Sequence, residues 1–104
     1  MSEIDDLQIL ISEFSTQREW EKFHSPKNLV MAITGEAGEL ASELQWISEN
    51  EIITDNPQLL NNIKLEIADI GIYLLRLCDR LEIDFADAIR EKLEINDSRF
   101  PKTK

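Results

Sequence analysis

The sequence predicts an all-α fold, an antiparallel bundle of about four helices that oligomerisation completes. Apolar residues recur at helical spacing in four segments, and no segment alternates with a period of two for long enough to form a strand. The chain has only 3 Gly and 3 Pro, which leaves little room for long loops. Its 104 residues suffice for one domain with a modest core. We therefore expect a single domain over residues 1–104, with flexible ends at 1–3 and 101–104.

The first two helices are marked by periodicity and by a capping signal. Apolar residues recur with a helical period from Leu7 to Phe14, which predicts a first helix over residues 4–23. Ser25-Pro26 then joins a good N-cap residue to a proline that suits the first turn of a helix. This signal predicts a second helix over residues 26–47.

The third and fourth helices begin with similar signals. Asn56-Pro57 repeats the combination of cap and proline, so a third helix is expected over residues 57–81. Asp84 can cap a fourth helix over residues 85–96.

The third helix carries apolar residues on two sides. One stripe includes Ile63 and Ile70, and a second, on a different side, includes Leu65 and Ile72. A helix that is apolar on two sides is buried on two sides, and a domain of this size can barely surround it. We infer a subunit interface and expect a homo-oligomer, a tetramer in preference to a dimer. The alternative is a central helix within the monomer.

Charge argues against nucleic-acid partners. The formal net charge is -10, from 21 acidic and 11 basic residues. Binding to a nucleic-acid backbone needs clustered Lys and Arg, so we expect no nucleic-acid partner.

The sequence also points to the cytoplasm. Cys78 is the only cysteine, which rules out an intramolecular disulfide and fits a reducing compartment. The first residues are acidic where a signal peptide would be basic. The longest apolar stretch, residues 67–77, is interrupted by Asp69 and Arg76, so no membrane partner is expected.

Two pairs of acidic residues are the most informative feature. Glu36 and Glu39 are three positions apart in the second helix, as are Glu66 and Asp69 in the third. This spacing puts each pair on one helical face. The connecting loop is short, so the helices should pack antiparallel, and residues whose numbers add to the same value then lie opposite each other. Glu36 thus faces Asp69, Glu39 faces Glu66, and four carboxylates converge.

Four converging carboxylates repel one another unless they are protonated or bind cations. Oxygen-only ligands suit Mg²⁺, with Mn²⁺ as a substitute, and we expect Glu36, Glu39, Glu66 and Asp69 to be metal ligands. Zinc is disfavoured because the chain has one His and one Cys, far apart in sequence. A di-iron site is disfavoured because no Glu-x-x-His motif exists. The alternative is that the four acids are simply solvated.

The same residues carry a resemblance to a known family. Gly35-Glu36-Ala37-Gly38-Glu39-Leu40 and Glu66-Ile67-Ala68-Asp69 resemble the acidic signature of the MazG-like, all-α nucleoside triphosphate pyrophosphohydrolases, above all their small dCTP pyrophosphatase branch. The likeness extends through residues 20–29, Gln45-Trp46, Ile72-Tyr73-Leu74, residues 92–96 and Arg99-Phe100-Pro101. MazG proper has an additional Glu where this chain has Gly35, a departure that leaves the four main acids intact.

The resemblance implies an enzyme that hydrolyses (deoxy)nucleoside triphosphates between the α and β phosphates, with dCTP preferred. The products would be a nucleoside monophosphate and pyrophosphate, and the role would be house-cleaning of nucleotide pools. Mg²⁺ held by the four acids would activate the attacking water. A MazG-like hydrolase selective for another base remains an alternative, as does a helical homo-oligomeric binding module without catalysis.

Further candidates could hold the substrate. Lys92, Asn96 and Arg99 share one face near the end of the fourth helix and could contact phosphate oxygens, although cations are also favourable at any helix C-terminus. Trp20, Trp46 and Tyr73 could stack on the base or could simply be core. His24, the only histidine, is expected to be structural or to line the pocket rather than to act as a general base.

Overall fold

The computed structural model describes residues 2–103 and is all-α, as predicted. Its elements are α1 (Glu3–Gln17), the 3₁₀ turn η1 (Glu21–Phe23), α2 (Pro26–Leu44), the 3₁₀ turn η2 (Ile53–Asp55), α3 (Pro57–Arg80) and α4 (Phe85–Arg99). No strand occurs among the described residues.

The predicted starts of α2, α3 and α4 are confirmed. The side chains of Ser25, Asn56 and Asp84 each accept a hydrogen bond from the backbone N–H three residues further on. The helix ends differ modestly from the expectation, because α2 ends at Leu44 and α4 continues to Arg99.

The predicted first helix over residues 4–23 is wrong at its C-terminal end. The helix α1 ends at Gln17, and Glu19 adopts a left-handed backbone conformation with φ 57°. The chain then turns back, and the N–H of Trp20 donates to the carbonyl oxygen of Ser15 at 2.9 Å. No glycine or proline marks this break. The turn matters for function because it carries Trp20 and η1 back toward α3.

The expected flexible ends are only partly described. Ser2 and Glu3 form the start of α1, where Ser2 caps the helix and forms a capping box with Asp5. Residues 101–103 have no regular secondary structure. Met1 and Lys104 lie outside the described residues.

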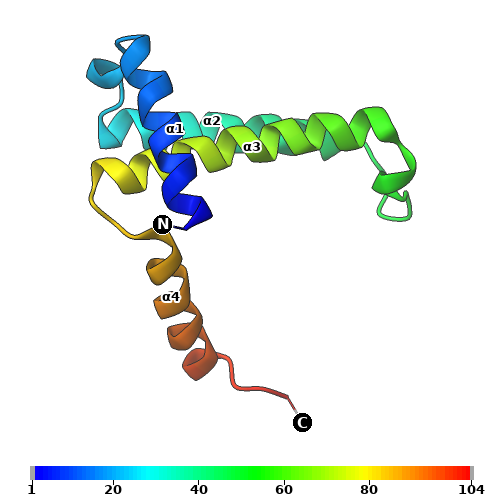
Figure 1. Ribbon diagram of the computed structural model, residues 1–104. Coiled ribbons are helices and arrows are strands. Elements are labelled where there is room, and N and C mark those ends of the chain that lie inside the picture. Colours follow the sequence, from blue (N-terminus) through cyan, green and yellow to red (C-terminus); the bar gives the residue numbers. More distant parts are fainter. Residues whose placement is uncertain (1, 104) are drawn as a thin grey trace.

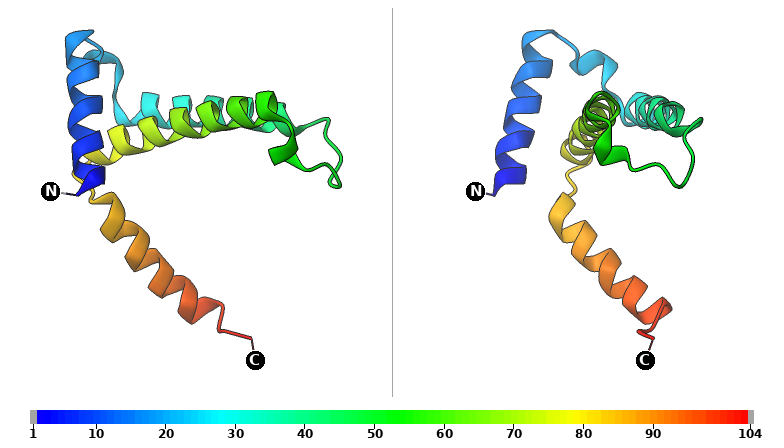
Figure 2. Two further views of the ribbon diagram at one scale, coloured as in Figure 1. Left: turned by 45° about the vertical axis from the view of Figure 1, so that its right-hand side comes forward. Right: turned by 90° about the vertical axis from the view of Figure 1, so that its right-hand side faces the viewer.

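The helices α2 and α3 form a long antiparallel hairpin that dominates the molecule (Figure 1). The helix α1 crosses α3 near the C-terminal end of α3, where Nε2 of Gln8 donates to the carbonyl oxygen of Leu75 at 3.2 Å. The helix α4 leaves this body and projects away from the hairpin, as Figure 2 shows from two further sides.

The chain buries little of its apolar surface on its own. Leu29 is 1% exposed and is the one fully buried large side chain in the described part of the protein, with Cys78 also buried. Large apolar side chains stay exposed along α3 and α4, among them Ile67 and Leu93. No helix among residues 2–103 combines the length and apolar character that crossing a membrane requires.

Candidate active site

Three carboxylates converge across the α2–α3 hairpin. Glu36 and Glu39 extend from α2 and Glu66 from α3, and one oxygen of each lies within 4.8 Å of the others. At the neighbouring turn, Nδ2 of Asn62 lies 3.5 Å from Oε2 of Glu43. Both contacts follow the antiparallel register inferred from the sequence, which places Glu39 opposite Glu66 and Glu43 opposite Asn62.

The cluster is electrostatically unsatisfied. Oε2 of Glu36 and Oε2 of Glu66 are buried and have no hydrogen-bond partner. Burial raises the pKa of Glu66 to about 7, helped by the neighbouring carboxylates of Glu36 and Glu39. Two ionised carboxylates cannot hydrogen-bond to each other, so protonation of Glu66 supplies the missing donor.

The donor set fits a divalent cation that prefers oxygen ligands. A cation among Glu36, Glu39 and Glu66 would satisfy the two orphaned oxygens and offset the repulsion, which otherwise favours a protonated Glu66. The three ligands come from two packed helices, so the hairpin itself positions them.

Asp69, the fourth predicted ligand, lies one helical turn beyond Glu66. It is exposed and is not part of the group within 4.8 Å. Instead it lines an adjoining cavity. Asp69 is thus the acidic residue of this region that lines the cavity, one helical turn from Glu66 of the cluster.

The cavity lies between α1, α3 and the segment that follows α1, and encloses about 460 Å³. Its wall includes Phe14, Trp20, His24, Asp69, Tyr73 and Arg76. The rings of Phe14 and Trp20 meet edge to face with centroids 5.6 Å apart, and Trp20 meets His24 similarly at 6.1 Å. An aromatic wall suits a flat ring, and the acidic edge beside it would accept an anionic group only through a bound cation.

Of the three aromatic candidates, Trp20 and Tyr73 line this cavity, whereas Trp46 does not. Trp46 lies just after α2, at the loop end of the hairpin, and is 87% exposed. His24 also lines the cavity, and lining a pocket was one of the two roles expected for it.

The phosphate-binding candidates stand apart from the cluster within this chain. Lys92, Asn96 and Arg99 lie on α4, which projects away from the hairpin (Figure 1). The guanidinium of Arg99 instead lies over the ring of Phe100, 5.1 Å from its centroid.

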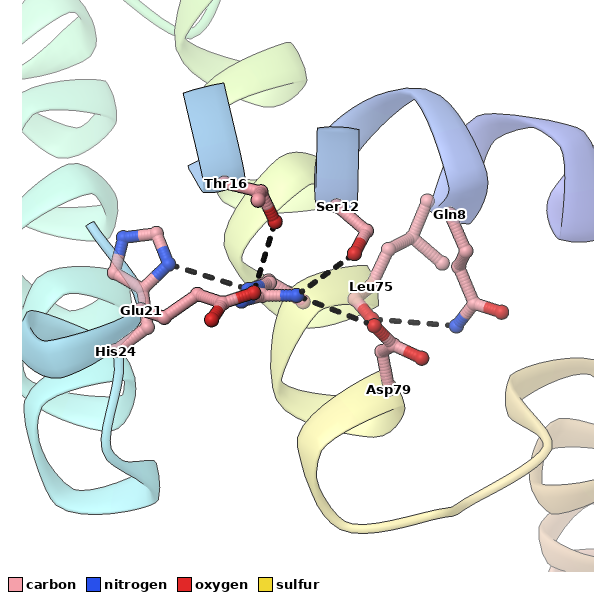
Figure 3. Close-up of polar contacts among 8 residues, drawn as sticks. Gln8, Ser12, Thr16, Glu21, His24, Leu75 and Asp79 are labelled. Carbon is pink, nitrogen blue, oxygen red and sulfur yellow. Dashed lines mark hydrogen bonds and ion pairs between the residues drawn. The ribbon is translucent and has the colours of Figure 1, made fainter. Parts of the chain in front are cut away.

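Sequence reasoning missed Arg76. Its Nε donates to Nδ1 of His24 at 3.2 Å, and Nη1 contacts Oδ2 of Asp79 at 3.2 Å. Figure 3 shows these contacts, with His24 and Ser12 reaching the same place on α3 from different segments. The sequence did hold one signal for it, because Arg76 is a charged residue within the apolar stretch 67–77 of α3.

Comparisons with known proteins identify relatives among the pyrophosphatases. No family model matches the chain. The chain is 37% identical to dCTP pyrophosphatase 1 of Homo sapiens and of Mus musculus, in each case over 100 residues that cover 94% of this chain and 59% of the relative. It thus spans well under two thirds of the length of these curated relatives.

A solved structure matches over almost the full length of both chains. It is a pyrophosphatase from Archaeoglobus fulgidus, with a TM-score of 0.85 and 35% identity over 98% of this chain and 95% of that one. This match and the all-helical fold place the chain in the class of all-α pyrophosphatases. The chain belongs to the MazG-like pyrophosphohydrolase family, and its curated relatives are from the dCTP pyrophosphatase branch.

Proposed function

We propose that this protein hydrolyses (deoxy)nucleoside triphosphates between the α and β phosphates, prefers dCTP, and releases dCMP and pyrophosphate. The observation that carries the proposal is the convergence of Glu36, Glu39 and Glu66, one helical turn from Asp69 in the wall of a cavity that Trp20 and Tyr73 also line. The names of the curated relatives support dCTP as the substrate. Clearing this nucleotide from the pool is the house-cleaning role we assign.

The acidic cluster would bind magnesium, and Mn²⁺ would substitute. A divalent cation in such a site supplies charge neutralisation for the triphosphate and lowers the pKa of water. Glu36 and Glu66 contribute the two buried oxygens that need a cation. Asp69 lines the cavity one helical turn from Glu66, so it would be the fourth ligand or would orient the attacking water.

The cavity would hold the nucleoside. Its volume of about 460 Å³ lies within the range of small-molecule sites. Trp20 and Tyr73 offer ring faces and edges to the base, and the acidic edge would place the triphosphate toward the cations. Trp46, at the loop end of the hairpin, would reach a base only if it came from another subunit.

We further infer that the active enzyme is a homo-oligomer. The chain exposes 8287 Å², against about 6,000 Å² for a compact monomer of its mass. Its radius of gyration is 16.8 Å, against about 13 Å for a compact chain of this length. Both differences, together with the exposed apolar side chains of α3 and α4, support an assembly in which other copies cover this surface.

Two separate apolar surfaces favour a tetramer over a dimer. One lies on α3 and includes Leu65 and Ile72, and the other lies on α4 and includes Ile89 and Leu93. Two different self-associating surfaces generate a tetramer with two kinds of interface. In this assembly α4 would bring Lys92, Asn96 and Arg99 to the triphosphate bound by another subunit.

The remaining proposals concern partners and compartment. We expect neither nucleic acid nor membrane as a partner, because the net charge of -10 repels anionic surfaces. A reducing cytoplasm suits the buried, unpaired thiol of Cys78, and we assign the protein to it.

The direct test is product analysis. The purified protein is incubated with a panel of dNTPs and NTPs, with Mg²⁺ and with EDTA, and monophosphate and pyrophosphate are quantified. Mg²⁺-dependent release of dCMP and pyrophosphate from dCTP is the expected result. Release of single phosphates would move the attack to the γ-phosphorus and overturn the mechanism. No turnover of any nucleotide would leave a binding module as the leading function.

A further inference from the structure

Arg76 places a buried positive charge beside the cavity. Its side chain is 3% exposed, whereas that of its only carboxylate partner, Asp79, is 43% exposed. Nη1 also lies 3.5 Å from Oγ of Ser12, and Nε donates to Nδ1 of His24 at 3.2 Å. Nη2 is buried and has no partner. An ion pair with such an exposed carboxylate contributes little to stability, so the burial of Arg76 calls for another explanation.

The contact with Arg76 fixes the protonation of His24. A guanidinium only donates hydrogen bonds and stays charged, so Nδ1 of His24 must present its lone pair. Burial and then the charges of Arg76 and Arg80 lower the pKa of His24, which agrees with a neutral ring. A neutral imidazole whose Nδ1 accepts carries its single proton on Nε2.

The arginine and the histidine both line the cavity, so the ligand meets donors rather than acceptors on this wall. His24 packs edgewise against Trp20, with ring centroids 6.1 Å apart and an interplanar angle of 61°. The Nε2–H of His24 lies on the opposite side of the ring from the Arg76 contact. Nη2 of Arg76 is itself buried and has no hydrogen-bond partner, so it affects this wall through its positive charge rather than by touching a ligand.

We propose that Arg76 is a positioning residue that holds His24 as a neutral Nε2–H donor, and that this donor selects bases with an acceptor edge. The proposal rests on the nucleotide hydrolysis proposed above and explains how it distinguishes pyrimidines. Cytosine offers O2 and N3 as adjacent acceptors. Uracil and thymine carry a hydrogen on N3, so this N–H and the Nε2–H of His24 would face each other and neither would find an acceptor.

The first experiment reads the tautomer directly. His24 is the only histidine, so the imidazole nitrogens of the ¹⁵N-labelled protein give a single set of signals. In the full-length wild-type protein at neutral pH, we expect a pyridine-type signal for Nδ1 and a pyrrole-type signal for Nε2. A proton on Nδ1 would overturn the proposal, whether or not the protein hydrolyses nucleotides.

The second experiment uses the Arg76→Met variant, with Arg80→Gln as a matched control. Arg80 is exposed, lies one turn further along α3 and acts on His24 through its charge alone. In Arg76→Met the Nδ1 signal should move toward the average of the two tautomers, whereas in Arg80→Gln it should stay unchanged. Circular dichroism confirms that both variants are folded.

Kinetics then separate positioning from a general structural role. In Arg76→Met, the KM for dCTP should rise roughly tenfold with kcat nearly unchanged, as expected for one lost hydrogen bond. The KM for dUTP should not rise, because dUTP loses no favourable contact. Equal losses for dCTP and dUTP would overturn the proposal.

If the wild-type protein turns over no nucleotide, the proposed function fails, and dCMP is then the probe. A shift of the His24 Nε2–H signal on adding dCMP would support the positioning role, and no shift would overturn it.

Discussion

Glu36 and Glu66 converge from the two helices of the α2–α3 hairpin, and each buries a carboxylate oxygen that has no hydrogen-bond partner. The two residues belong to different helices, so their repulsion acts on the packing that forms the site. Without a bound cation, these two buried carboxylates therefore lower the stability of the fold. With the proposed cation bound, the same carboxylates would stabilise the fold instead of destabilising it.

Magnesium should therefore stabilise the fold. At a Mg²⁺ concentration about 100 times its Kd, the free energy of unfolding should rise by about 2.7 kcal/mol through linkage. Thermal unfolding with increasing MgCl₂ measures this effect, with NaCl of equal ionic strength as the control. The Glu36→Gln variant should lose most of the response, and a full response in that variant would exclude Glu36 as a ligand.

Stability without metal should fall as the pH rises. The pKa of Glu66 is raised from 4.5 in the unfolded chain to about 7 in the folded one. Between these values the folded protein keeps a proton that the unfolded chain has released, so raising the pH favours unfolding. Chemical unfolding in EDTA, at intervals from pH 4.5 to pH 7.5, measures the slope. In Glu66→Gln this contribution should vanish, whereas Glu49→Gln, at an exposed acid in the loop, should retain it.

Removal of single carboxylates should separate catalysis from folding. Glu39→Gln and Asp69→Asn should each lower kcat/KM for dCTP by at least about a hundredfold. Losing a residue that hydrogen-bonds to a metal ligand typically costs about 10- to 100-fold, and losing the ligand itself should cost more. Both variants should unfold at or above the wild-type temperature, since each removes a charge from the acidic region. Glu49→Gln serves as the control in the same assay. Full activity in either variant would exclude that residue from the site.

Trp20 should contribute to base binding. Because base–aromatic stacking contributes about 1–3 kcal/mol, Trp20→Ala should raise the KM for dCTP about tenfold or more. The chain has two tryptophans, so a Trp46→Phe variant leaves Trp20 as the sole tryptophan reporter. Its fluorescence should change when dCMP is added. An unchanged signal would place the base elsewhere.

Catalytic sites shared between subunits should show complementation. Glu39→Gln and Lys92→Ala chains should each be nearly inactive alone, the first without its metal ligand and the second without its phosphate contact. Mixed oligomers formed by co-expression contain sites built from an intact cluster and an intact α4, so they should recover a substantial fraction of activity. Failure to recover would mean that Lys92 acts within its own chain or not at all.

The helix starts and the hairpin register follow from local chemistry, and both are readable in the sequence. Ser25, Asn56 and Asp84 each have a side chain that caps a helix without help from distant residues. The short loop between α2 and α3 leaves one antiparallel arrangement, so Glu39 and Glu66 could be paired from their numbers alone.

The parts that eluded prediction depend on contacts between distant segments. Glu19 has no local reason to adopt a positive φ, and its conformation reflects the return of Trp20 toward α3. The partnership of Arg76 with His24 joins residues more than fifty positions apart, and no periodicity marks it. Whether Asp69 completes the cluster depends on details of packing that spacing does not specify.

The projection of α4 away from its own chain has a consequence for dynamics. Most of its residues are exposed, and an isolated helix of 15 residues is only marginally stable in water. In a dilute single chain, the amide hydrogens of α4 should therefore exchange with solvent long before those of α2 and α3. The same amides would become slow to exchange as copies associate, so hydrogen exchange along α4 reports assembly residue by residue.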